Sequence, residues 1–132
     1  MMAGPAGISS KNGPALDLPA RFMGLAMAML AIVALSSPRA YPLLLEGFYA
    51  PRLLAFVHLN TLGVIAAMLI GASYQLLPVV LQTPLASIRL GRLSFWLYLA
   101  GLLLFLPGLF LTWRPAIALG AMFVFGGLAV YA

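Results

Sequence analysis

The sequence predicts an all-α fold, a polytopic bundle of four transmembrane helices, and two observations carry this prediction. First, 64% of the 132 residues are hydrophobic and only 7% are charged, which is too apolar a composition for a soluble domain. Second, the few charged residues divide the chain into four long apolar segments. Because about 20 apolar residues span the hydrocarbon core, the partner that we expect is the lipid bilayer.

Charge and cysteine content exclude several classes of function. The formal net charge is +5, but the basic residues stand singly between apolar segments, so we expect no nucleic-acid binding. The chain has no cysteine, which rules out disulfides, thiolate metal sites and haem attached through a CxxCH motif. Any metal or cofactor must therefore be held by histidine, methionine or oxygen ligands.

The first part of the chain predicts a tail followed by a span. Residues 1–17 are rich in Gly, Pro, Ala and Ser and predict a mobile N-terminal tail, and the transmembrane four-helix domain covers residues 18–132. The first span is expected at about 18–37, before Pro38 and Arg39. A cleaved signal peptide is the alternative, because residues 22–35 have the length of its apolar core. The long, weakly basic segment in front of them favours a span.

The connection over residues 39–52 contains aromatic residues that favour the membrane interface, namely Tyr41, Phe48 and Tyr49. Glu46 is the only acid after Asp17. With no acid or base near it in sequence, Glu46 is interpreted as a solvated loop charge rather than as a catalytic carboxylate.

The second span, expected at about 53–81, holds the only histidine of the chain, His58. An imidazole inside a membrane is costly without a hydrogen-bond partner, a metal or a water-filled cavity. On a helical wheel of about 100° per residue, Leu62, Ile65 and Leu69 fall within roughly 40° of His58. This face offers an apolar wall beside one strong ligand, which suits a flat ring such as haem.

Small residues recur on the opposite side of the same span at a spacing of four, at Gly63, Ala67 and Gly71. Such a stripe lets a neighbouring helix approach closely and predicts a helix-packing face. Near the end of the span, Tyr74 and Gln75 are interpreted as interface anchors.

The remaining spans are expected at about 93–112, after a turn carrying Arg89 and Arg92, and at about 115–132. Because the last span ends without a polar flank, we expect the chain to be the N-terminal part of a longer bundle. Basic residues fall into two groups, on either side of the membrane: Lys11, Arg21, Arg89 and Arg92 against Arg39, Arg52 and Arg114. Their bias predicts a cytoplasmic N-terminus in the inner (plasma) membrane of a bacterium.

His58 is the candidate ligand, to haem iron in the first place and to copper as the lesser alternative. Thr61, one turn further on, is the candidate side chain for orienting the imidazole ring by a hydrogen bond. The structural alternative is a histidine that is merely hydrogen-bonded to a carbonyl or hydroxyl of a neighbouring helix. The methionines are scattered through apolar spans, where they ordinarily fill gaps.

One stretch of about a third of the chain resembles a known family. The pattern begins with His58 near the start of a helix and continues with Leu62, Gly63, Gly71, Tyr74, Pro78, Pro84, Ser87, Arg89, Leu90, Phe95 and Trp96. It is similar to subunit I of the haem-copper oxidases, and within them to the C-type cytochrome c oxidases and nitric oxide reductases.

The resemblance implies a membrane protein that binds haem and takes part in respiratory electron transfer. By order along the chain, His58 stands where that family has an axial ligand of the low-spin haem. By its local sequence pattern, the stretch that begins at His58 is equally similar to a later helix of that family, which carries a copper ligand. The family core has more helices and more histidines, so this chain is not catalytically complete alone. A second axial ligand would come from a C-terminal part, another subunit or a second copy.

Two other functions remain open from the sequence. The first is a non-redox membrane scaffold or assembly subunit with the same fold and no cofactor, in which the small-residue stripe mediates helix association. The second is a small transporter or channel, which is less favoured because the spans contain no acid and no polar face.

Overall fold

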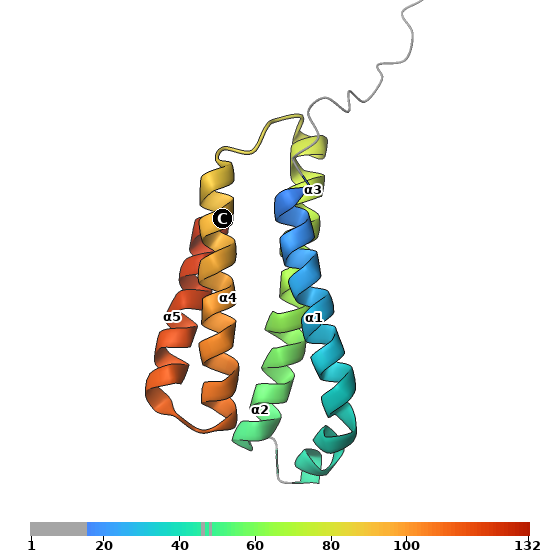
Figure 1. The fold of residues 1–132 in the computed structure, drawn as a ribbon, viewed down its shortest axis with the longest axis vertical. Coiled ribbons are helices and arrows are strands. Elements are labelled where there is room, and N and C mark those ends of the chain that lie inside the picture. Colours follow the sequence, from blue (N-terminus) through green and yellow to red (C-terminus); the bar gives the residue numbers. More distant parts are fainter. Residues whose placement is uncertain (1–15, 46, 48) are drawn as a thin grey trace, which may run out of the picture.

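The computed structural model describes residues 16–45, 47 and 49–132, and these residues form a helical bundle without strands (Figure 1). Residues 1–15 of the predicted 1–17 tail and the loop residues Glu46 and Phe48 lie outside the described part. The helices are α1 (Asp17–Ala40), α2 (Pro51–His58), α3 (Ala67–Leu81), α4 (Ile88–Phe110) and α5 (Arg114–Tyr131). A 3-10 turn, η2 (Tyr41–Leu45), follows α1, and a π-helical segment, η3 (Leu59–Ala66), joins α2 to α3.

The predicted fold class is confirmed, because four helical segments are long and apolar enough to cross a membrane: Asp17–Leu45, Pro51–Leu81, Ile88–Phe110 and Arg114–Tyr131. Only 22% to 33% of the most apolar window of each segment is buried within the protein. The outward side chains are large and hydrophobic, so a bilayer is the environment that covers them.

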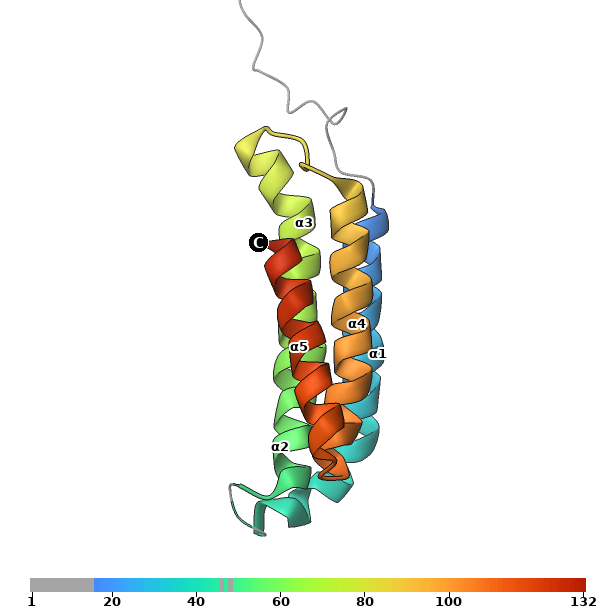
Figure 2. The same ribbon diagram turned by 90° about the vertical axis from the view of Figure 1, so that its left-hand side faces the viewer.

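The four segments run alternately up and down and group into two pairs (Figures 1 and 2). In one pair, α1 lies against η3 and α3, and in the other α4 lies against α5. Glycines set the close approach within the second pair. A Cβ added at Gly101 would lie 2.5 Å from the backbone nitrogen of Val124, and one added at Gly120 would lie 2.5 Å from that of Phe105. Only glycine fits at such short helix–helix distances.

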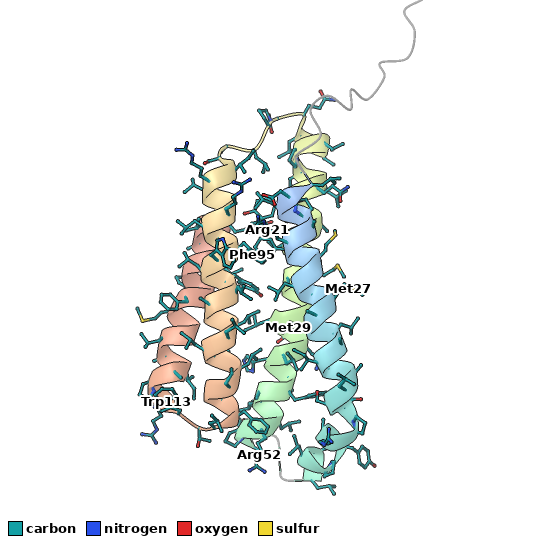
Figure 3. All side chains as sticks on the ribbon, in the orientation of Figure 1. Arg21, Met27, Met29, Arg52, Phe95 and Trp113 are labelled. Carbon is teal, nitrogen blue, oxygen red and sulfur yellow. The ribbon has the colours of Figure 1, made fainter. Side chains whose placement is uncertain are left out.

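An aromatic cluster joins the two pairs near the end where α1 begins. Phe22 of α1 is fully buried, and its ring contacts the rings of Tyr74, Phe95 and Tyr98 at centroid distances of 5.7, 5.2 and 6.0 Å. Figure 3 shows Phe95 and Arg21 on facing helices, and the Arg21 guanidinium lies 5.9 Å from the Phe95 ring centroid. This cluster is the core that holds the four helices together.

At the same end, Asp17 makes two ion pairs, one within α1 to Arg21 and one to Arg92 that links α1 to α4. Its carboxylate accepts from Nε of Arg21 at 2.8 Å and from Nε of Arg92 at 3.0 Å. The structure thereby corrects the prediction of a turn over Arg89 and Arg92, because both residues already belong to α4. Ser87 begins this helix by accepting a hydrogen bond from the Leu90 backbone N–H at 3.4 Å.

The role predicted for Tyr74 as an interface anchor is wrong. Tyr74 is only 6% exposed, and its ring packs against Phe22 of α1 and edge-on against Tyr131 of α5. The hydroxyl of Tyr131 is hydrogen-bonded to Ser73, the residue before Tyr74. The aromatic ring is thus used to tie three helices together, while Gln75 is exposed as predicted.

Candidate cofactor site at His58

His58 is the last residue of α2 and directly precedes the π-helical segment η3. Polar side chains at this junction bond to carbonyls one turn back. Asn60 Nδ2 donates to the Phe56 carbonyl at 2.9 Å, and Thr61 Oγ1 donates to the Val57 carbonyl at 3.0 Å. Such bonds satisfy polar groups inside an apolar span, and π-helical turns are frequent at functional sites.

The hydrogen bond of His58 determines which of its two ring nitrogens carries the proton. Nδ1 lies 2.7 Å from the Leu54 carbonyl oxygen. Since a carbonyl only accepts, Nδ1 must carry the proton and donate. In the neutral ring, Nε2 then keeps its lone pair and is the nitrogen available to a metal. A backbone carbonyl behind the ring is a common way to orient a metal-ligating histidine.

The predicted role of Thr61 as orienter of His58 differs from the observed contacts, because the Thr61 hydroxyl donates to Val57 and the His58 ring bonds to Leu54. Phe105 of α4 also fixes the His58 ring, which it meets edge-to-face at a centroid distance of 5.3 Å.

A groove of about 350 Å³ lies beside His58, between the second span and the α4–α5 pair. It is lined by His58, Thr61, Leu62, Phe105, Ala121, Val124, Phe125 and Leu128. Only the first two of these side chains are polar, and the Thr61 hydroxyl is already used. The groove is therefore an apolar slot with one nitrogen ligand.

The wall of this groove differs from the one predicted on the helical wheel. Leu62 lines it, whereas Ile65 and Leu69 do not and are 56% and 65% exposed on the outer surface. The physical reason is the segment η3, since π-helical hydrogen bonding places more residues in each turn than the α-helical wheel assumes. The actual wall comes from α4 and α5, and the sequence reasoning missed it because these residues approach only through tertiary packing.

The small-residue stripe faces α1. Gly63, Ala67 and Gly71 are all buried. A Cβ added at Gly63 would lie 3.2 Å from the Cβ of Met29, and one added at Gly71 would lie 3.1 Å from the Cβ of Phe22. The stripe therefore packs against a helix within this chain, on the side away from the His58 groove.

The donor set of the groove fits haem better than copper. His58 Nε2 would be the one ligand that this groove offers to a haem iron, and an apolar slot suits the ring. Copper sites need several nitrogen or sulfur ligands. Among residues 16–45, 47 and 49–132, no group of three or more His, Cys, Asp or Glu side chains could hold a metal ion. A larger groove exists elsewhere between α1, α2 and α4, but His58 does not line it.

Comparison with family models, with curated proteins and with solved structures finds no match to this chain, so its function has to be argued from its own residues.

Proposed function

We propose that this chain binds haem through His58 and takes part in respiratory electron transfer as one part of a larger membrane assembly. The observation that supports this proposal is the hydrogen bond from His58 Nδ1 to Leu54. It leaves Nε2 as the free ligand beside an apolar groove. When bound, haem supplies the one-electron redox couple that the side chains of this chain lack.

The residues of the groove have distinct roles in this proposal. His58 would hold the iron through the lone pair of Nε2, and the Leu54 carbonyl holds the ring in the tautomer that leaves this nitrogen free. The aromatic edge of Phe105 restrains the ring, and Leu62 and Phe125 keep water from the iron. Since the sequence has one histidine, any further histidine that holds the group would come from another chain, a second copy or a C-terminal extension.

The proposed setting is the inner membrane of a bacterium with the N-terminus in the cytoplasm. Arg21, Arg89 and Arg92 lie towards the end of the bundle where α1 and α4 begin, and Arg39, Arg52 and Arg114 lie towards the other end. Lys11, which precedes α1 in the sequence, gives the first group four basic residues against three. By the positive-inside rule, this small excess supports a cytoplasmic position for the first end. His58 is about two turns from the start of α2, and with this orientation we propose that it lies in the outer half of the membrane.

The test is the haem content per chain of protein purified from haem-sufficient cells. We expect His58→Ala to remove haem while the protein remains in the membrane. Phe125→Ala should lower haem retention several-fold, because this side chain lines the groove and is 74% exposed, so its loss leaves the core intact. Phe123→Ala, two residues away on the same helix and outside the groove lining, is the matched control. Equal haem contents in all four proteins would contradict the proposal.

A non-redox scaffold or assembly subunit is the second candidate, and one observation favours it. Within the described residues, no buried side-chain nitrogen or oxygen lacks a hydrogen-bond partner, so no buried polar side chain needs a cofactor to satisfy it. Under this reading, His58 is a polar side chain satisfied by Leu54. Iron-free protein from haem-sufficient cells would support this candidate.

A further inference from the structure

A second groove, of about 680 Å³, lies between the last turns of α1, the start of α2 and the second half of α4. Its volume is within the range of small-molecule binding sites. The lining is almost wholly apolar, with Met29 and Ile32 from α1, Phe56 from α2, and Leu103 and Leu106 from α4. Figure 3 shows that Met29 points into the bundle, whereas Met27, two residues earlier, points away from it.

Two arginines line the same groove at the membrane-interface end, Arg39 from the last turn of α1 and Arg52 from the first turn of α2. The Arg52 guanidinium lies 5.7 Å from the Phe110 ring centroid, which holds the charge beside the groove (Figure 3). Asp17, the only acidic side chain in the part of the chain that the structure describes, lies at the opposite end of α1.

We propose that this groove binds an anionic phospholipid of the surrounding leaflet, with the phosphate at Arg39 and Arg52 and an acyl chain along Ile32, Leu103 and Leu106. The division of the lining supports this occupant, because one end is cationic and the remainder is hydrocarbon-like. Arginine forks match the oxygens of a phosphate group, which every phospholipid head group of this kind carries. The groove contains no imidazole, so this site is independent of the proposed haem site.

The proposed contact of the phosphate with Arg39 and Arg52 is tested by measuring which lipids stay bound. The full chain is purified from nanodiscs that contain equal phosphatidylglycerol and phosphatidylcholine, and native mass spectrometry measures how much of each lipid stays bound. We expect a preference for phosphatidylglycerol that falls about 30-fold in the Arg39→Gln/Arg52→Gln double variant, since each basic residue near an anionic head group contributes roughly a factor of five. Arg114→Gln is the matched control, because Arg114 is exposed near the same end of the bundle but outside the groove lining.

The proposed position of the acyl chain is tested by a substitution that fills the groove. Ile32→Trp adds bulk at a position that is 48% exposed and lines the groove, so both lipids should be lost from the site. Leu119→Trp, at a position that is 51% exposed on α5, is the control and should retain them. Three results would overturn the assignment to an anionic phospholipid. The unmodified chain could retain the two lipids equally, or Arg114→Gln could lose the preference for phosphatidylglycerol as much as the double variant does. In the third, a fatty acid at matched concentration would displace the bound phospholipid.

Discussion

The close contact between α4 and α5 makes a specific prediction for two glycines of the same helix. Gly120 and Gly126 both lie on α5, but they face different surroundings. A Cβ added at Gly120 would lie 2.5 Å from the nitrogen, 2.7 Å from the Cα and 2.8 Å from the Cβ of Phe105. A Cβ added at Gly126 would meet nothing within 4 Å. Gly120→Ala and Gly126→Ala therefore make a matched pair.

The magnitude follows from these distances. Ordinary contacts begin at 3.4 Å, so Gly120→Ala requires the two backbones to separate by about 0.9 Å. Overpacking costs about 1–3 kcal/mol, and this contact belongs to the upper part of that range, about 2–3 kcal/mol, because backbone atoms of Phe105 cannot rotate aside. Alanine regains about 1 kcal/mol through its higher helix propensity. We expect Gly120→Ala to lower the free energy of unfolding by about 1–2 kcal/mol. Gly126→Ala, which has only the propensity gain, should raise it by up to about 1 kcal/mol.

The assay is reversible unfolding in mixed micelles with increasing dodecyl sulfate, followed by helix content and by tryptophan fluorescence. Trp96 on α4 and Trp113 before α5 report on the pair directly. An equal change for the two variants, or unfolding of Gly120→Ala that matches the unmodified chain, would refute the close helix contact.

Other contacts of the core make further predictions for the same unfolding assay. Tyr98→Phe removes the hydrogen bond that the buried hydroxyl donates to the Leu62 carbonyl at 2.8 Å, and it should cost about 0.5–1.5 kcal/mol. Tyr49→Phe, at a position that is 90% exposed, should change the free energy of unfolding by less than about 0.5 kcal/mol. Gly71→Leu forces bulk against the Cβ of Phe22, 3.1 Å from an added Cβ, and should weaken the packing of α1 on α3 by at least about 1–3 kcal/mol. An unchanged free energy of unfolding for Tyr98→Phe or Gly71→Leu would contradict the corresponding contact.

Composition and the spacing of the charged residues were enough to predict the fold class. Long apolar segments separated by single charges leave few alternatives to a bundle of spanning helices, and the structure has four such segments. Helix starts were less predictable. Arg89 and Arg92 suggested a turn, whereas the Ser87 side chain caps α4 before them. Arg92 then lies within the helix and forms an ion pair with Asp17.

The candidate site was predictable only in part, because it depends on tertiary contacts. His58 stood out as the one imidazole in a span. Ile65 and Leu69 were placed beside it by an α-helical wheel that does not hold across the π-helical segment. Phe105 and Phe125 lie on helices distant in sequence, and close glycine packing of α4 on α5 brings both to the groove. The recurrence of glycine in the last two spans was the available signal.

The central claim, that His58 is a haem ligand, is tested most directly by a reduced-minus-oxidised visible spectrum. The spectrum and the iron content are measured on the purified full chain and on His58→Ala, both expressed with sufficient haem. We predict a sharp reduced band and bound iron in the unmodified chain, and the loss of both in His58→Ala. An iron-free protein with a blank spectrum, or a band that persists unchanged in His58→Ala, would contradict the assignment.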